Sequence, residues 1–167
     1  MIKKYKEYTV EKIDHDSPVI RLAKNQGKPY DQITILHCSN NQLTSLEGIE
    51  NLVNLQKLNC SHNRLTSLEG IENLVNLRQL YCYNNQLTSL EGIENLVNLQ
   101  TLDCSYNQLT SLEFGDFSIE AFELGIDETD LRRFKKLKEL YCVGNQFSNR
   151  YKEYVDGWSK RKNIRTF

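Results

Sequence analysis

One string of twelve residues, LTSLEGIENLVN, occurs three times without a change in this chain. The copies begin 22 residues apart, and the segments that join them share the pattern L-x-x-L-x-C-x-x-N-x. A single repeat of this length cannot bury its own apolar ridge, so each unit must stack on its neighbours. The repeat therefore predicts a short coil of stacked units. The three copies run from Leu43 to Asn54, from Leu65 to Asn76 and from Leu87 to Asn98.

Two apolar spacings follow each other within every unit. The segment L-x-L-x-C alternates apolar and polar residues, which is the period of a β-strand with one buried face. In the rest of the unit apolar residues recur at every third position, which suits 3₁₀ or polyproline-like segments better than an α-helix. Stacking predicts a parallel sheet with strands about 4.8 Å apart on the concave face, and a thin convex side. Gly48, Gly70 and Gly92 lie where that convex arc must bend tightly.

The repeats extend beyond the three identical copies. The pattern also fits residues 33–43 and 137–147, but 38 residues separate Leu99 from Leu137. One interpretation is a 16-residue insertion. The other is a degenerate repeat at 119–136, in which Ile119, Phe122 and Leu124 take the apolar positions. We favour the degenerate repeat, because an insertion would leave a long unstructured loop in a compact domain.

The two ends are expected to close the coil, because a solenoid exposes apolar surface at its termini. Residues 1–32 form the predicted N-terminal cap, with a hairpin whose strands are Tyr8 to Ile13 and Val19 to Leu22. The repeats occupy 33–147. Residues 148–167 form a helical cap, whose apolar stripe contains Tyr151, Tyr154, Val155 and Trp158.

Asparagine and cysteine each recur at one fixed position of the repeat. The asparagine follows the strand, where its amide can satisfy backbone groups as the chain turns. The cysteine points inward and acts as a small apolar residue in a narrow core. A metal site is the alternative, but ligands spread along a line do not converge as tetrahedral zinc requires. The columns are Asn41, Asn63, Asn85, Asn107 and Asn145, and Cys38, Cys60, Cys82, Cys104 and Cys142.

From Ile33 to Phe147 the chain resembles the 22-residue leucine-rich repeats of internalin-like proteins and of a regulatory subunit of phosphatase-1. The cysteine and the near-identical copies are most similar to leucine-rich repeat proteins of large DNA viruses that infect amoebae, and of some protists and bacteria. The resemblance implies an α/β fold, a right-handed solenoid with capped ends, and protein binding. The chain differs from secreted internalins because it lacks a signal peptide and a surface anchor.

The charge balance narrows the function. The chain has 167 residues, with 21 Lys and Arg against 22 Asp and Glu. Nucleic-acid binding and a polybasic membrane surface both need an excess of basic residues, so we expect neither. No segment approaches the roughly 18 apolar residues of a membrane span. Five cysteines without an export signal favour reduced thiols and a cytoplasmic setting, the host cytoplasm if the protein is viral.

The near-neutral total hides a division along the chain. Residues 32–131 carry 3 basic and 14 acidic groups, whereas residues 132–167 carry 11 and 3. The basic end could meet an acidic partner or the acidic body of a second copy, although a solvated cap is the simpler interpretation. Its basic residues include Arg132, Arg133, Lys135, Lys136, Lys160, Arg161 and Lys162.

Differences among the repeats fall on the outward strand positions and the two positions after them, while the convex arc is identical. Copies that differ only there present a distinct surface on a constant frame, and tyrosine is enriched at binding hot spots. An exposed tyrosine ladder without a partner is the alternative. The predicted binding residues are His37, Lys57, Asn59, His62, Gln79, Tyr81, Tyr83, Asp103, Tyr106 and Tyr141.

We therefore expect a monomeric interaction module that binds a protein or peptide on its concave face. A structural protein that assembles with itself is the alternative. An enzyme is not expected, because His37 and His62 lie near no obvious nucleophile, and the sequence has no phosphate loop or H-E-x-x-H motif. No cofactor or metal is expected.

Overall fold

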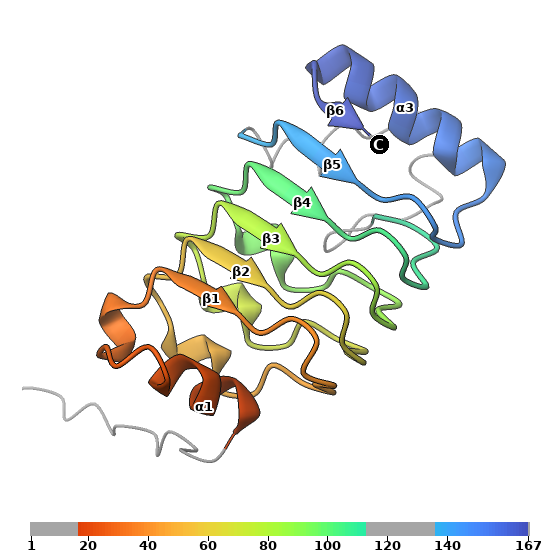
Figure 1. Cartoon of the computed structure of the whole chain (residues 1–167). Helices are drawn as coiled ribbons and strands as arrows, with labels where there is room; N and C mark the ends of the chain where they lie inside the picture. The colour runs from red at the N-terminus through yellow and green to blue at the C-terminus, as the bar shows by residue number, and fades with distance from the viewer. Residues whose placement is uncertain (1–16, 113–135, 167) are drawn as a thin grey trace, which may run out of the picture.

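The computed structural model describes residues 17–112 and 136–166. The six strands of this part form one parallel sheet, in which the strands follow each other in chain order. Figure 1 shows them side by side along the molecule, with a helix near each end. The predicted solenoid is therefore confirmed. The strands are β1 (Ile35–His37), β2 (Lys57–Asn59), β3 (Gln79–Tyr81), β4 (Thr101–Asp103), β5 (Glu139–Tyr141) and β6 (Arg165–Thr166).

Residues at the same repeat position form straight rows across the sheet. Leu58 lies opposite Leu36 on one side and Leu80 on the other, and the flanking strand residues keep this register. The central row points into the core, as the alternating pattern predicts. Its five leucines are at most 2% exposed: Leu36, Leu58, Leu80, Leu102 and Leu140.

On the other side of the core, each of the identical strings LTSLEGIENLVN turns through a short 3₁₀ helix, and a further one, η1, precedes β1. Gly70, which precedes one of these helices, has a φ of 93°, a left-handed conformation that disfavours a side chain. A Cβ atom there would also lie 2.9 Å from Cγ2 of Ile49 in the preceding coil. Glycine is needed for both reasons, so the predicted bend is confirmed. The 3₁₀ helices are η1 (Tyr30–Gln32), η2 (Ile49–Asn51), η3 (Ile71–Asn73) and η4 (Ile93–Asn95).

Two other invariant side chains also support the coil. The carboxylate of Glu72 accepts a hydrogen bond from the backbone N–H of Gly70 at 2.9 Å. The amide of Asn76 donates to the carbonyl oxygen of Val53 in the preceding coil at 3.1 Å. Glu94 repeats the first contact on Gly92, and Asn98 repeats the second on Val75. These contacts explain part of the identity among the copies.

The N-terminal hairpin prediction is wrong where the structure tests it. Residues Pro18–Lys24 form helix α1 instead of a strand. Ser17 caps the helix by accepting the N–H of Ile20 at 3.2 Å, and proline occupies the first helical position, where its missing N–H costs nothing. Val19, Ile20 and Ala23 are buried against the first coil. The other predicted strand, Tyr8 to Ile13, lies outside the described residues.

The C-terminal helix prediction is confirmed by α3 (Asn149–Lys162). Tyr151 and Val155 are buried, and the hydroxyl of Tyr151 accepts the N–H of Leu112 at 2.7 Å. The side chain of Trp158 lies outside the described part. Strand β6, which follows the helix, was not predicted. None of the helices described has the length and apolar character needed to cross a membrane.

The predicted degenerate repeat is contradicted by the pairing of the sheet. β4 pairs directly with β5, with Thr101 opposite Glu139, so no repeat strand from 119–136 lies between them. Residues 113–135 are outside the described part of the chain. The interval of 38 residues between Leu99 and Leu137 thus connects two neighbouring strands of the sheet. The boundaries drawn at 32 and 148 remain predictions.

Candidate binding surface

The outward residues of the sheet form two parallel rows. We call these rows, together with the two residues that follow each inward cysteine, the sheet face. The first row crosses the first residue of each strand, from Ile35 to Arg165, and the second crosses the third residue, from His37 to Tyr141. In chain order they are Ile35, Lys57, Gln79, Thr101, Glu139 and Arg165, and then His37, Asn59, Tyr81, Asp103 and Tyr141.

The chain leaves each strand through a left-handed residue at the edge of this face. Asn40, His62, Asn84 and Tyr106 have φ between 54° and 60°, a region that few residues other than glycine adopt. Gly144 occupies the equivalent position after β5. A Cβ atom there would lie 2.5 Å from the ring of Tyr106, so Tyr106 packs directly on the glycine.

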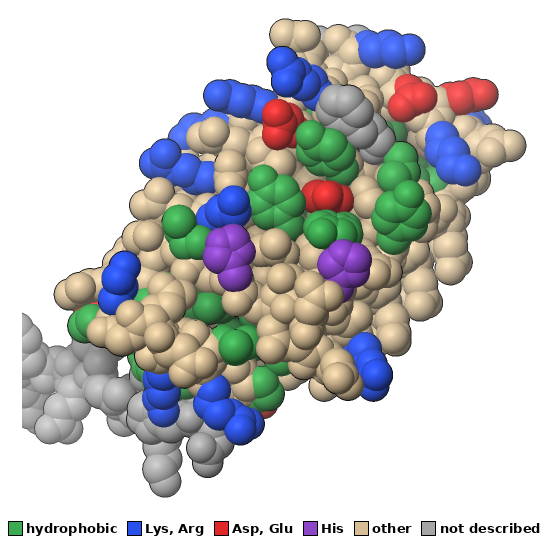
Figure 2. Space-filling view, viewed as in Figure 1, with side chains coloured by type: hydrophobic (Ala, Val, Ile, Leu, Met, Phe, Trp, Pro, Cys, Tyr) green, Lys and Arg blue, Asp and Glu red, His purple; other side chains and the backbone are tan. Residues whose placement is uncertain are grey.

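All ten predicted binding residues lie on the sheet face. Figure 2 shows this side of the molecule, with the histidines, aromatic side chains and charges gathered over the strands. His37, His62 and Tyr106 are exposed, and Tyr106 is 62% accessible. The structure thus brings the residues together, while their role in binding stays a prediction. The other seven are half-buried: Lys57, Asn59, Gln79, Tyr81, Tyr83, Asp103 and Tyr141.

Aromatic rings on the sheet face pack against their neighbours. The ammonium nitrogen of Lys57 lies 5.3 Å from the ring centroid of Tyr81, within range of a cation–π interaction. The rings of His62 and Tyr83 meet edge to face, with centroids 4.8 Å apart. Nδ1 of His62 also lies 2.6 Å from the side-chain nitrogen of Asn84. These contacts restrict the orientations of the rings.

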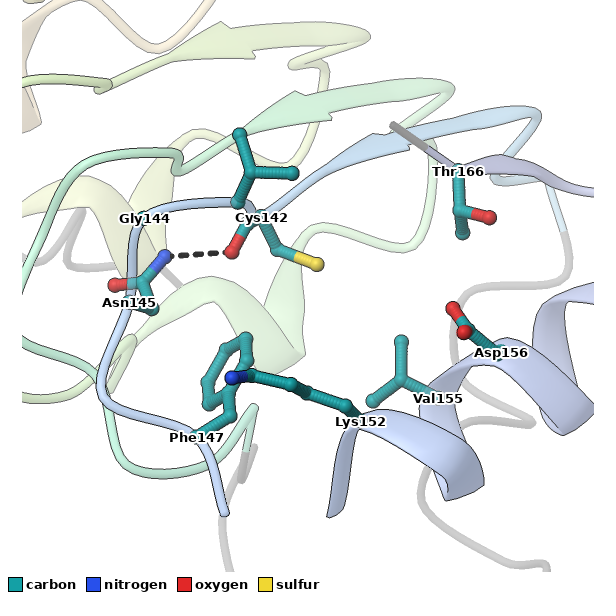
Figure 3. A pocket seen from close by; sticks show the side chains of 9 residues that line it. Cys142, Gly144, Asn145, Phe147, Lys152, Val155, Asp156 and Thr166 are labelled. Atoms are coloured by element: carbon teal, nitrogen blue, oxygen red, sulfur yellow. Dashed lines mark hydrogen bonds between the residues drawn. The ribbon is translucent and has the colours of Figure 1, made fainter. Parts of the chain in front are cut away.

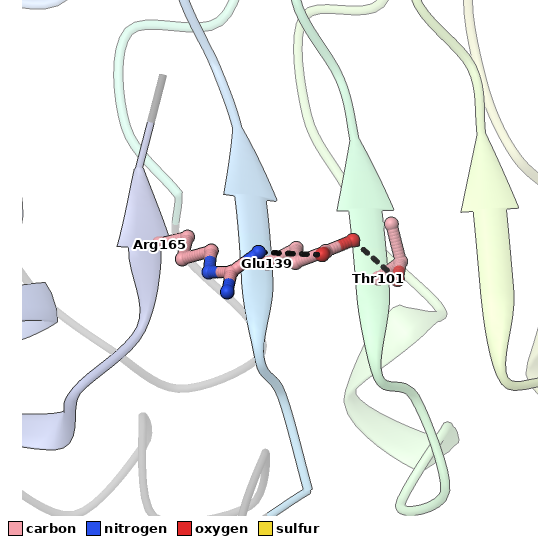
Figure 4. Close-up of polar contacts among 3 residues, drawn as sticks. All are labelled: Thr101, Glu139 and Arg165. Atoms are coloured by element: carbon pink, nitrogen blue, oxygen red, sulfur yellow. Dashed lines mark hydrogen bonds and ion pairs between the residues drawn. The ribbon is translucent and has the colours of Figure 1, made fainter.

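Two acidic residues, Asp103 and Glu139, lie beside the tyrosines. Glu139 accepts a hydrogen bond from the Thr101 hydroxyl at 3.2 Å and faces Arg165 at 4.0 Å (Figure 4). The pKa of Tyr81 is raised, first by burial and then by the charges of Glu139 and its neighbours Tyr141 and Asp103. The two carboxylates therefore disfavour further negative charge in this half of the face.

Several residues of the sheet face were not among those predicted. Ile35 and Val143 are exposed apolar side chains, 46% and 49% accessible. Thr101 and Glu139 occupy the same row as Lys57 and could have been included from their repeat position. No sequence pattern indicated Arg165 as a residue of the sheet, because a two-residue strand is too short to show an alternation of apolar and polar residues.

The asparagine column is structural, as the sequence predicts. Oδ1 of Asn85 accepts the N–H of Leu65 at 3.0 Å, and its amide nitrogen donates to the carbonyls of Cys60 and Cys82 at 3.1 and 3.0 Å. Asn85 is buried. Asn63, Asn107 and Asn145 repeat this arrangement, and Asn41 at the first coil donates only to Ser39.

The cysteine column lies inside the core. Sγ of Cys82 lies 3.4 Å from the carbonyl oxygen of Asp103, and Cys60 and Cys104 make the equivalent contact with the next strand. Burial raises the pKa of all these thiols, to about 11 at Cys142 and about 12 at Cys38. In the described ranges, no group of three or more His, Cys, Asp or Glu is placed to hold a metal ion.

A model of leucine-rich repeats in two copies matches residues 31–73 and 75–116, about half of the chain. The chain belongs to the leucine-rich repeat family. A comparison with curated proteins finds no match.

Among solved structures, this leucine-rich repeat chain is similar to an internalin, InlF, from Listeria monocytogenes. The TM-score is 0.58 at 23% identity, over 81% of this chain and 40% of that one. It is also similar to the functional domain of InlJ from Listeria monocytogenes, described as including a cysteine ladder, with a TM-score of 0.49 and 26% identity. That match covers 72% of this chain and 32% of InlJ. The leucine-rich repeat chain thus spans less than half the length of either protein.

A cavity lies at the C-terminal end of the leucine-rich repeats, between the last coil and α3. It has a volume of about 420 Å³, and Figure 3 shows Asp156 and Val155 of the helix facing Cys142 across it. The sequence analysis did not predict it. Its lining is Cys142, Val143, Gly144, Asn145, Phe147, Lys152, Val155, Asp156 and Thr166.

The convex side of the leucine-rich repeats has two further hollows, of about 450 and 390 Å³, between successive coils. Both are lined by glutamates of the repeated string, including Glu69 and Glu72. Because identical coils produce identical hollows, these sites offer the same acidic chemistry at each position.

Proposed function

We propose that the protein is an interaction module whose sheet face binds a protein or an extended peptide. The observation that carries this proposal is where the repeats differ. Val53, Val75 and Val97 are 45%, 47% and 53% exposed, yet they are identical in the three copies. Exposure alone therefore does not explain why residues on the sheet face vary.

The chemistry of the face favours a protein partner. Tyrosine offers a large, rigid contact area together with a hydroxyl, and it is enriched at the centre of protein interfaces. Tyr81 and Tyr83 project from the same coil, and both are already packed against neighbours. Because these rings are ordered beforehand, binding would lose less side-chain entropy. A cytoplasmic setting belongs to the same proposal.

Affinity capture from the cell that produces the protein tests this function. The double variant Tyr81→Ala/Tyr83→Ala is compared with wild type and with Val75→Ala/Val97→Ala, which changes exposed convex residues. We expect the tyrosine variant to lose the partners that wild type and the valine variant retain. Circular dichroism and thermal melting verify that all three are folded. Equal capture by the three proteins would overturn the proposal.

Self-assembly is the second candidate, favoured by the charge division along the chain. Residues 32–131 have 11 more acidic than basic groups, and residues 132–167 have 8 more basic than acidic ones. Complementary charges of this kind can bring copies together, and salt screens the attraction. Light scattering at rising protein concentration and at two salt concentrations tests it. A constant monomer mass under all conditions excludes this candidate.

A further inference from the structure

Asp103 is the central charge of the tyrosine-rich half of the sheet face. In the second row it lies between Tyr81 of β3 and Tyr141 of β5. Figure 2 shows acidic side chains set among hydrophobic ones on this side of the molecule. The row alternates ring, carboxylate and ring at the spacing of adjacent strands, about 4.8 Å.

Among the described residues, one oxygen of this carboxylate has a hydrogen-bond donor and the other has none. Oδ1 of Asp103 accepts the N–H of Ser105 at 3.1 Å. Asp103 forms no ion pair within the part of the chain that the structure describes. Glu139 differs, because Thr101 and Arg165 already contact its two oxygens. Asp103 is therefore the acidic group that is oriented but not neutralised.

The neighbouring rings suit a cation. Lys57 already lies over Tyr81 at 5.3 Å, which shows that this ring accepts an ammonium group. Burial is the main cause of the raised pKa of Tyr81, and the charges of Glu139 and Asp103 add to it, so two carboxylates act on this ring. A cation placed between the rings would be attracted by the carboxylate and by both aromatic rings. These electrostatic attractions are screened less at a half-buried site than in open solvent.

We propose that Asp103, flanked by Tyr81 and Tyr141, binds a lysine or arginine side chain of an extended peptide partner. This inference rests on the proposed function, because it specifies the partner chemistry of the same surface. The ammonium or guanidinium group pairs with the free carboxylate oxygen, and the tyrosine rings enclose the aliphatic part of the side chain.

Selection from a random peptide library displayed on phage tests this inference. The immobilised proteins are wild type, Asp103→Asn and Glu91→Gln. Asparagine keeps the acceptor for the Ser105 N–H, and Glu91→Gln removes the same charge from an exposed convex position. We expect wild type and Glu91→Gln to enrich peptides with a shared Lys or Arg, and Asp103→Asn to lose that enrichment.

Calorimetry with one selected synthetic peptide gives the magnitude. Asp103→Asn is expected to weaken binding by about tenfold or more. Replacement of the peptide's basic residue by glutamine should weaken it by the same factor. When both changes are made together, the loss of affinity should be smaller than the sum of the two separate losses in binding free energy. The peptide-side change needs no altered protein, so the test survives poor folding of the variant.

The outcomes separate the inference from the proposed function. If wild type selects no peptide, the inference fails, and affinity capture alone decides the proposed function. If wild type selects peptides that lack a shared basic residue, or if Asp103→Asn binds them equally well, the cation site is wrong while the binding function stands. If the losses of binding free energy from the protein change and the peptide change add fully, the basic residue of the peptide does not contact Asp103, and the inference is also overturned.

Discussion

At the scale of single residues, the most consequential side chains are the polar ones that the coil has enclosed. We expect Asn85→Leu to lower the free energy of unfolding by about 1 to 3 kcal/mol for each backbone group left unpaired. The group that loses its partner is the Leu65 N–H, because the Cys60 and Cys82 carbonyls each keep an amide donor, from Asn63 and Asn107. Urea unfolding measures the change. Asn41→Leu is the control, because Asn41 is exposed at the first coil, and an equal loss there would contradict this account.

Ser61 is a residue for which the opposite result is expected. Its hydroxyl is fully buried and has no hydrogen-bond partner among the described residues, so removing it relieves the cost of burying an unpaired polar group. Ser61→Ala should leave the urea midpoint unchanged or raise it. Ser17→Ala, which removes the cap of α1, should instead cost about 0.5 to 2 kcal/mol. A clear loss of stability in Ser61→Ala would show that its hydroxyl has a partner.

The buried thiols give a prediction about pH. Their pKa values are raised above the ordinary value of 9.0, to about 11 at Cys142 and about 12 at Cys38. Folding therefore favours the protonated thiol, and this contribution is complete below pH 9 and is lost as the pH rises from 9 towards 12. At pH 8 a thiol-specific reagent should leave Cys38, Cys60, Cys82 and Cys104 nearly unlabelled in the folded protein, label the half-buried Cys142 first, and modify all five in urea. Rapid labelling of Cys60 or Cys82 in the folded protein would contradict this burial.

The sequence predicts the residue roles well where one position recurs. The inward cysteine and the turn asparagine each occur at the same repeat position in five repeats, so the repeat pattern was enough to predict their surroundings. The Asn54, Asn76 and Asn98 row was missed because its partners are carbonyls of the preceding coil, and only the stacked arrangement reveals them.

At the scale of elements, prediction succeeds inside the repeat and weakens outside it. The strands and 3₁₀ turns follow from two apolar spacings. The helix α1 was read as a strand because seven residues are too few to show a helical period, and the signal lay in the Ser17 cap and Pro18. The degenerate repeat rested on three apolar residues at matching spacings, which the direct pairing of β4 with β5 contradicts. The sheet face was located correctly, but Arg165 required β6, whose pairing is tertiary.

The start of each 3₁₀ helix supplies the prediction at this scale. We expect Gly70→Ala to destabilise the protein by about 1 to 3 kcal/mol more than Gly27→Ala, because only the first forces a methyl group into packed atoms. Both glycines have positive φ, but a Cβ at Gly70 would meet Ile49, whereas nothing lies within 4 Å at Gly27. Urea unfolding of the two variants measures the difference. Equal losses would mean that backbone conformation alone requires glycine there.

At the scale of the whole molecule, the identical coils imply that one of them is dispensable. Removing residues 65–86 deletes β3 and joins Arg64 to Leu87. β4 would then pair with β2 in the same register in which β3 pairs with β2 now. Gly92 would then meet Ile49 as Gly70 does now. The new contacts reproduce existing ones, and a solenoid is stabilised by contacts between neighbouring repeats. We expect this variant to fold cooperatively, with a lower urea midpoint and a smaller dependence on urea, because less surface is exposed on unfolding.

The matched control removes half a repeat. Deleting residues 65–75 joins Arg64 to Asn76, so the chain lacks the apolar positions from Leu65 to Leu74 that complete one coil. The glycine and 3₁₀ turn of that coil are also lost, and the next strand cannot reach the register of β2. Far-ultraviolet circular dichroism and urea titration should therefore show a folded protein for the 22-residue deletion and an unfolded or severely weakened one for the shorter deletion. If the shorter deletion were the more stable, the neighbouring coils would not be interchangeable, and the stacking that underlies the whole fold would need another explanation.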